Sequence, residues 1–232
     1  MRANEQEGVA MTTFTTVRGG VFLTLILALT ACGNAQQDEA NLLKSLPKAI
    51  FSRKAPPPVV TPEQLGQALA STSAAITLYV SEQTKGQFLL QDIERNGPYQ
   101  SFGSASRRVI VMRDGMITST RGLGGDLMSS EEDDLLALVK RAAPGTARYV
   151  QRFLTPEDVN VTYEYACSLD IGSSIPVVAG ALNTSARMVT ATCIGAHGEF
   201  TNTYAVNGGQ ILSSRQWLGD TLGYMQTQAI RL

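Results

Sequence analysis

The chain has 232 residues, 44% of them hydrophobic, with 21 glycines and 9 prolines, so it is long enough for one large or two small turn-rich domains. Its 19 basic and 20 acidic side chains nearly cancel. A chain with so little net charge has no electrostatic reason to bind nucleic acid, and we predict no nucleic-acid partner.

Residues 1–31 have the pattern of a bacterial lipoprotein signal peptide. Arg18 supplies a positive charge, and the apolar run VFLTLILALTA (21–31) is too short to span a bilayer but has the length of a secretory h-region. The run ends in LTAC (29–32), which resembles the lipobox, where the thiol of Cys32 is alkylated with diacylglycerol and the chain is cut just before it. The alternative is an ordinary signal peptide with an incidental cysteine.

Two or more acyl chains on Cys32 would anchor the protein stably, at about 0.8 kcal/mol per buried methylene group. Gly33 and Asn34 follow the cysteine, and the lack of an aspartate at the second mature position resembles Gram-negative lipoproteins sorted to the outer membrane. We therefore expect a lipid anchor at the periplasmic face of that membrane. The start codon stays open between Met1 and Met11.

Two cysteines remain once Cys32 is assigned to the lipid. Cys167 and Cys193 can pair in an oxidising periplasm, and on the chain-entropy model such a bond adds roughly 3–4 kcal/mol of stability. The alternative is two buried free thiols. The only histidine, His197, lies in the turn-like stretch GAHGEF, so we predict neither a metal site nor a cofactor.

Residues 32–60 are expected to form a flexible tether, because GNAQQDEA is polar and the three prolines of SRKAPPPVV impose an extended polyproline geometry. Between these stretches, NLLKSLPKAIF predicts a short helix broken at Pro47. TPEQLGQALAST (61–72) predicts a helix with Thr61 as N-cap and Pro62 at its first position.

From Ala75 onward short segments rich in β-branched and aromatic residues predict strands. The first group of predicted strands is AITLYVSE, QFLLQDIER, RRVIVMRD and MITSTRG, separated by the turn sequences TKG, NGP and RDG. The second group is NVTYEYACSL, ARMVTATCIG, GEFTNTYAV and GQILSSRQWL. Between the two groups, SSEEDDLLALVKRAAPG (129–145) predicts a serine-capped helix whose acids complement the helix dipole, with a cation site as the alternative.

These elements predict an all-β, mainly antiparallel fold over residues 61–232. Barrels and sandwiches are the usual solutions for many short hairpin-linked strands, so we expect barrel-like or sandwich-like units with two or three short helices.

An internal repeat indicates that the β-unit is duplicated. DGMITSTRGLGGD (114–126) aligns without gaps with GGQILSSRQWLGD (208–220), a shift of 94 residues. Upstream, NGPYQSF resembles HGEFTNTY. We predict duplicated units at about 75–128 and 160–222, with chance similarity between two hairpins as the alternative.

The repeat contains one arginine in each copy, Arg121 and Arg215. Each shares its strand parity with an isoleucine, and an arginine that faces a core needs a carboxylate or carbonyl partner. Asp126 and Asp220, five residues later, are the natural candidates. The alternative is that both arginines line a groove for an anionic or hydroxyl-rich polymer, where Trp217 would suit stacking on a sugar face.

No catalytic motif is complete. GLGGD does not satisfy the dinucleotide fingerprint, no Walker A or G-x-S-x-G sequence is present, and a Ser-His-Asp triad would depend on His197. Paired carboxylates for glycoside hydrolysis are a spatial property. Glu164, between two tyrosines on a predicted strand, stands out among the acids, and a solvent-facing strand position is the alternative. We predict that the protein is not an enzyme. A periplasmic polysaccharide-modifying hydrolase is the alternative.

With the lipobox, the run DGMITSTRGLGGDLMSS and the ending FTNTYAVNGGQILSSRQWLGDTLGYMQTQAIRL, the chain resembles the YjbF/GfcB family of exopolysaccharide and group 4 capsule lipoproteins. The resemblance covers about residues 60–232 and departs from the family at Ala205, where a bulkier residue is expected.

The resemblance implies an all-β periplasmic lipoprotein without known catalytic residues. Its implied role is that of an accessory factor in polysaccharide secretion or assembly, alongside an outer-membrane barrel and periplasmic companion proteins. The polysaccharide itself is a further candidate partner. An envelope-assembly lipoprotein that contacts proteins only is the other alternative.

Overall fold

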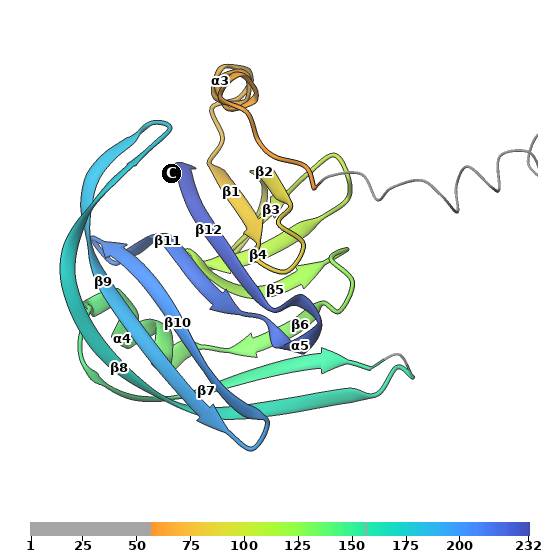
Figure 1. Ribbon diagram of the computed structural model, residues 1–232, viewed down its shortest axis with the longest axis vertical. Coiled ribbons are helices and arrows are strands. Elements are labelled where there is room, and N and C mark those ends of the chain that lie inside the picture. Colours follow the sequence, from red (N-terminus) through yellow and green to blue (C-terminus); the bar gives the residue numbers. More distant parts are fainter. Residues whose placement is uncertain (1–56, 156) are drawn as a thin grey trace, which may run out of the picture. The chain divides into compact units, whose positions relative to one another are not determined.

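The structure, a computed structural model, describes residues 57–155 and 157–232. The predicted signal peptide (1–31), Cys32 and most of the predicted tether lie outside these residues. The described part has three helices and twelve strands (Figure 1). Within it, no helix combines the length and the apolar character needed to cross a membrane.

The helices are α3 (Pro62–Ser71), α4 (Asp133–Arg141) and α5 (Gly219–Leu222). The strands are β1 (Ile76–Ser81), β2 (Gln87–Asn96), β3 (Tyr99–Gly103), β4 (Val109–Arg113), β5 (Met116–Arg121), β6 (Leu127–Glu131), β7 (Gly145–Leu154), β8 (Asn160–Ala179), β9 (Leu182–Gly195), β10 (Gly198–Asn207), β11 (Gln210–Trp217) and β12 (Tyr224–Arg231).

All twelve strands belong to one antiparallel sheet in the order β5-β4-β3-β2-β1-β12-β11-β10-β9-β8-β7-β6. Only β1 and β12 depart from sequence order as neighbours, so the sheet is an antiparallel meander whose two arms meet at this pair. Its end strands β5 and β6 follow each other in the chain, and the curved sheet nearly closes into a barrel (Figure 1). The predicted all-β fold with short helices is confirmed, as one barrel-like sheet.

Two apolar clusters fill the space that the sheet encloses. One lies between α4 and strands β7 to β11, and the other lies among β1 to β5, α5 and β12. Three tyrosines with at most 1% of their surface exposed, Tyr79, Tyr149 and Tyr204, are the largest buried side chains. Burying a large side chain contributes roughly 1.5–3 kcal/mol, so these clusters supply much of the drive to fold.

The repeated sequence folds as two hairpins, β4–β5 and β10–β11, with the same register. Each has a two-residue turn with positive φ at both positions, Asp114–Gly115 and Gly208–Gly209, as a type I′ turn requires. Each also has one irregularity at the same place, which leaves Thr118 in β5 and its counterpart Leu212 in β11 as the extra residue. The two aligned segments therefore have the same turn type and the same bulge position.

The two hairpins touch each other. The backbone N–H of Ile211 donates to the carbonyl oxygen of Asp114 at 3.0 Å. A Cβ atom on Gly115 would lie 2.4 Å from the carbonyl oxygen of Ile211, so only glycine fits this turn.

The helix predicted over 129–145 is shorter in the structure. Residues 127–131 form β6, and the N-cap of α4 is Glu132, not the predicted serine. Glu132 is 2% exposed and accepts hydrogen bonds from Ser130 at 2.8 Å and Arg113 at 3.4 Å. The first part of the acid run therefore belongs to a strand, because pairing with β7 outweighs local helix propensity.

Candidate functional site

A groove of about 380 Å³ crosses the face of the sheet opposite the core, over strands β1, β12, β11, β10 and β9. The apolar side chains in it are those of Leu78, Val80, Met188 and Ala205. The polar ones that reach solvent are those of Thr203, Ser213, Arg215, Gln226 and Gln228, of which Gln226 is exposed and the others are partly exposed. Strand alternation explains the composition, because the intervening residues, such as Tyr79, point into the core. We call this feature the Arg215 groove.

Arg215 is held in place by Glu82, which follows β1. Its Nε and Nη2 atoms donate to the two carboxylate oxygens of Glu82 at 2.7 and 2.8 Å, and Gln226 Nε2 donates to Glu82 Oε1 at 2.7 Å. The guanidinium also lies 3.3 Å from the ring centre of Tyr224. This bidentate, stacked geometry is one that arginine provides and lysine does not.

The ion pair changes the titration of both partners. Hydrogen bonds from Arg215 hold the pKa of Glu82 below its ordinary value of 4.5. In turn, the Glu82 carboxylate raises the pKa of Arg215. Both groups therefore stay charged at neutral pH. The Arg215 charge in the groove is compensated by Glu82 beside it and is surrounded by amide and hydroxyl groups.

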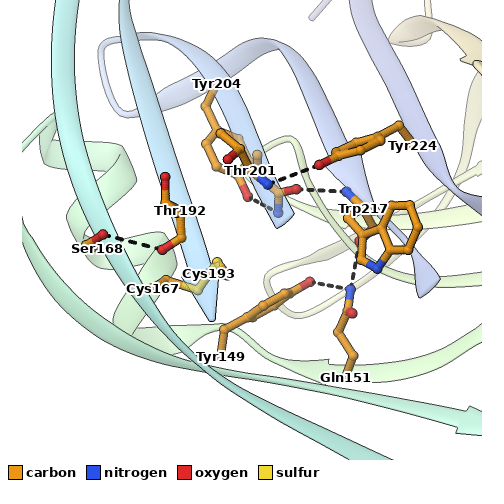
Figure 2. Close-up of a disulfide and its surroundings, with 11 residues drawn as sticks. Tyr149, Gln151, Cys167, Ser168, Thr192, Cys193, Thr201, Tyr204, Trp217 and Tyr224 are labelled. Atoms are coloured by element: carbon orange, nitrogen blue, oxygen red, sulfur yellow. Dashed lines mark hydrogen bonds between the residues drawn. A yellow bond between two sulfur atoms is a disulfide. The ribbon is translucent and has the colours of Figure 1, made fainter. Parts of the chain in front are cut away.

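Trp217 is packed against the core rather than presented in the groove. Its ring stacks on Phe200 at 6.4 Å between centroids and meets the edge of Tyr224 at 5.1 Å. Its backbone N–H donates to Asn202 Oδ1 at 2.8 Å, and its carbonyl oxygen accepts from Gln151 Nε2 at 2.8 Å (Figure 2). It supports Tyr224, and through it the Arg215 guanidinium.

Arg121 does not line the groove. It donates to backbone carbonyls, from Nη1 to Leu127 at 3.2 Å and from Nη2 to Met128 at 3.3 Å. These two carbonyls belong to β6, so the guanidinium bridges the two end strands of the sheet, which no backbone ladder joins. The arginines at equivalent positions of the repeat therefore have different surroundings.

The expected partnership with Asp126 and Asp220 is wrong for both arginines. Arg121 uses carbonyls and Arg215 uses Glu82. The Asp126 carboxylate instead accepts hydrogen bonds from the backbone N–H groups of Gly122 at 2.8 Å and Leu123 at 3.1 Å. This carboxylate thus organises the GLGGD loop as a closed turn.

The predicted disulfide between Cys167 and Cys193 is present (Figure 2). The two cysteines face each other on β8 and β9, and both are fully buried. Glu164 lies on the opposite face of β8, exposed, where it pairs with Arg148 at 3.0 Å. Across residues 57–155 and 157–232, no three His, Cys, Asp or Glu side chains gather as metal ligands would.

Sequence reasoning missed Glu82, Gln226 and Gln228. They come next to Arg215 only because β1 and β11 both neighbour β12. Glu82 lies 133 residues before Arg215, so no local spacing could have indicated the pair.

The fold is shared with a solved structure, the hypothetical lipoprotein YmcC from Escherichia coli. The two have a TM-score of 0.64 at 11% sequence identity, over 81% of this chain and 94% of that one. Among curated proteins, no match was found. The sequence model of the family described as "Group 4 capsule polysaccharide lipoprotein gfcB, YjbF" matches residues 43–230. The chain belongs to the YjbF family.

The YjbF match covers β1 to β11 in full and β12 up to residue 230, and with them both equivalent hairpins and the Arg215 groove. The resemblance noted from the sequence is therefore confirmed. The family description, group 4 capsule polysaccharide lipoprotein, therefore applies to this chain at the level of the family.

Proposed function

We propose that the protein is an outer-membrane-anchored lipoprotein that faces the periplasm and assists the secretion or assembly of an exopolysaccharide or capsule without catalysing a reaction. The observation that carries the proposal is the YjbF family match over residues 43–230. The lipobox at Cys32 supports the anchor. The proposed partners are an outer-membrane barrel and periplasmic proteins of the export pathway.

The positions of the acidic side chains favour binding over hydrolysis. A glycosidase needs two carboxyl groups on either side of the scissile bond, about 5–9.5 Å apart. Asp126 is occupied by backbone amides, and Glu164 is exposed beside Arg148. Beside the Arg215 groove, the carboxylate of Glu82 is neutralised by its ion pair with Arg215.

The anchor is tested by complementing a strain that lacks the gene with the wild-type chain or with Cys32→Ala. We expect the wild-type chain to fractionate with the outer membrane and to restore surface polysaccharide. Cys32→Ala should be released from the membrane and should fail to restore it. Full restoration by a Cys32→Ala chain that is soluble in the periplasm would contradict the proposed anchor.

A second element of the proposal is that the polysaccharide contacts the Arg215 groove. Amide and hydroxyl groups beside a planar guanidinium offer both donors and acceptors to sugar hydroxyls. Gln226 is the best probe, because it is exposed and hydrogen-bonds to Glu82 at the edge of the groove.

Binding of the host's purified polysaccharide to the full-length protein in detergent measures this contact. Gln226→Ala should weaken binding by about fivefold, the value of one lost hydrogen bond. Gln83→Ala, an exposed glutamine in the turn after β1, is the matched control and should not weaken it. Wild-type binding that survives Gln226→Ala would place the glycan elsewhere. No binding by the wild type would favour protein partners only.

A further inference from the structure

A second cavity opens at one end of the barrel, among β1, β3, β4 and β11. It has a volume of about 270 Å³ and an apolar floor formed by Ile76, Phe102, Met112, Ile211 and Leu212. Thr77 and Gln210 complete this part of its wall. The cavity lies beside the start of β1, which α3 precedes in the chain, yet no residue of α3 lines it.

The segment that includes α3 and β1 has a counterpart in α4 and β7. TPEQLGQALASTSAAITLYV (61–80) aligns without gaps with EEDDLLALVKRAAPGTARYV (131–150), a shift of 70 residues. The two helices end at equivalent residues, Ser71 and Arg141. Tyr79 and Tyr149 also coincide, and each is 1% exposed in the core. The duplication thus extends from the hairpins to a helix and its following strand.

The cavity occupies the position in the first aligned segment that corresponds to the position of α4 in the second. Leu135, Leu136 and Val139 of α4 are at most 2% exposed, in a cluster that includes Met116, Ala147 and Val206. In the two alignments, Met116 corresponds to Gln210 and Val206 to Met112 (a shift of 94 residues), and Ala147 corresponds to Thr77 (a shift of 70 residues). All three corresponding residues line the cavity. In the first half, the place for a helix is therefore left open.

Helix α3 has much of what such a position requires. Leu65, Ala68 and Leu69 share one face of the helix, and Leu65 and Leu69 correspond to Leu135 and Val139. Nevertheless, no residue of α3 is buried. In the described position α3 stands away from the sheet (Figure 1). Its Ala68 lines a different groove, formed with residues of β2 and β3.

Arg231, near the end of β12, holds α3 in this position. Its Nη1 donates to the carbonyl of Leu69 at 3.1 Å, its Nε and Nη2 donate to Ala74 at 3.0 and 2.8 Å, and Nη2 also donates to Thr72. Arg231 also lines the cavity, so the residue that holds α3 outside the cavity is itself part of the cavity wall.

We propose that α3 has two positions, one outside, held by Arg231, and one docked in the cavity as α4 is docked in its own half. Residues 72–75 join α3 to β1, whereas residues 142–144 join α4 to β7, so the connection is long enough. Docking buries Leu65 and Leu69 but gives up the Arg231 contacts. Gly66, which stands where α4 has Leu136, also weakens the docked form. Because these effects oppose each other, α3 can exchange between the outside and the docked positions, and we call it the α3 strap.

Disulfide cross-linking of the full-length protein, purified in detergent, tests the strap. Leu65→Cys with Met112→Cys should cross-link only in the docked position. Gln67→Cys with Met112→Cys is the matched control, since Gln67 lies on the opposite face of the same helix. Ala68→Cys with Leu89→Cys reports the described position, because both residues line the same groove. Leu65→Cys with Gln210→Cys replaces the first pair if Met112→Cys impairs folding.

We expect the Leu65 pair to form faster than the Gln67 pair. Arg231→Gln should raise its rate by about tenfold, because two or more hydrogen bonds to the outside position are lost. Equal rates for the Leu65 and Gln67 pairs would overturn the proposal. So would cross-linking confined to the Ala68 pair in both the parent and Arg231→Gln, or a Met112→Cys cross-link that joins two copies of the chain.

Discussion

At the scale of single residues, the two arginines of the repeat illustrate how neighbours in the sheet determine a side chain's role. Arg215 pairs with Glu82 because β12 brings β1 within reach of β11. Arg121 sits at an end strand and therefore meets the free carbonyls of β6. That each arginine needs a partner could be predicted from the sequence. Which partner it finds depends on pairings between distant segments.

Replacing Glu82 with glutamine tests the energetic value of the ion pair. Both side chains are partly exposed, so we expect Glu82→Gln to lower the free energy of unfolding by about 1 kcal/mol at neutral pH. The folded-state pKa of Glu82 is lowered, so its contribution is complete above the ordinary value of 4.5 and is lost as the pH falls through the folded-state pKa.

Urea unfolding as a function of pH measures this contribution. The difference between Glu82→Gln and the parent should shrink toward zero in acid. Glu199→Gln, an exposed glutamate of β10, serves as the control and should have little effect at any pH. A difference that stays constant from neutral pH to acid would contradict the assignment of this effect to the Glu82 charge.

At the scale of elements, the seam between β5 and β6 depends on side chains, because no ladder of backbone hydrogen bonds joins the two strands. Arg121→Ala removes the guanidinium that bridges them. We expect amide hydrogen exchange in β5 and β6 to become about tenfold faster, because the two strands open locally more often once these side-chain hydrogen bonds are lost. Arg107→Ala, at an exposed arginine in the β3–β4 turn, is the control. Unchanged exchange at the seam in Arg121→Ala would exclude this bridging role.

The disulfide also joins two elements, because Cys167 of β8 and Cys193 of β9 face each other in the sheet. The double substitution Cys167→Ala with Cys193→Ala should lower the free energy of unfolding by about 3 kcal/mol, through the added freedom of the unfolded chain. The antiparallel sheet should survive, as measured by circular dichroism. An unchanged unfolding midpoint would show that the bond contributes nothing to stability.

Several elements could be predicted because their signals are local. The N-cap at Thr61 and the turn at Asp114–Gly115 both appear as expected, since each depends on a few adjacent residues. The length of β8 could not be predicted. This strand continues to Ala179 through Gly172 and Pro176, residues that usually interrupt strands, because β9 pairs with it along that length.

At the scale of the whole described part, the two segments of the predicted repeat belong to one sheet. Strands six places apart in the sheet order, such as β5 and β11 or β4 and β10, hold equivalent places in the two halves. The similarity of the two hairpins could be seen in the sequence, and Gly115 and Gly209 do occupy turns of the same type. Whether the halves close one barrel or two depends on the β1–β12 pairing, in which Ile76 meets Arg231, and this pairing leaves no sequence signal.

The function proposed for the molecule is support of polysaccharide export. The most direct test is the amount of surface polysaccharide in a strain that lacks the gene, measured together with its cytoplasmic precursors. We predict that surface polysaccharide is lost while the precursors remain intact, and that the wild-type gene restores it. Normal surface polysaccharide in the deletion strain would contradict a role in export.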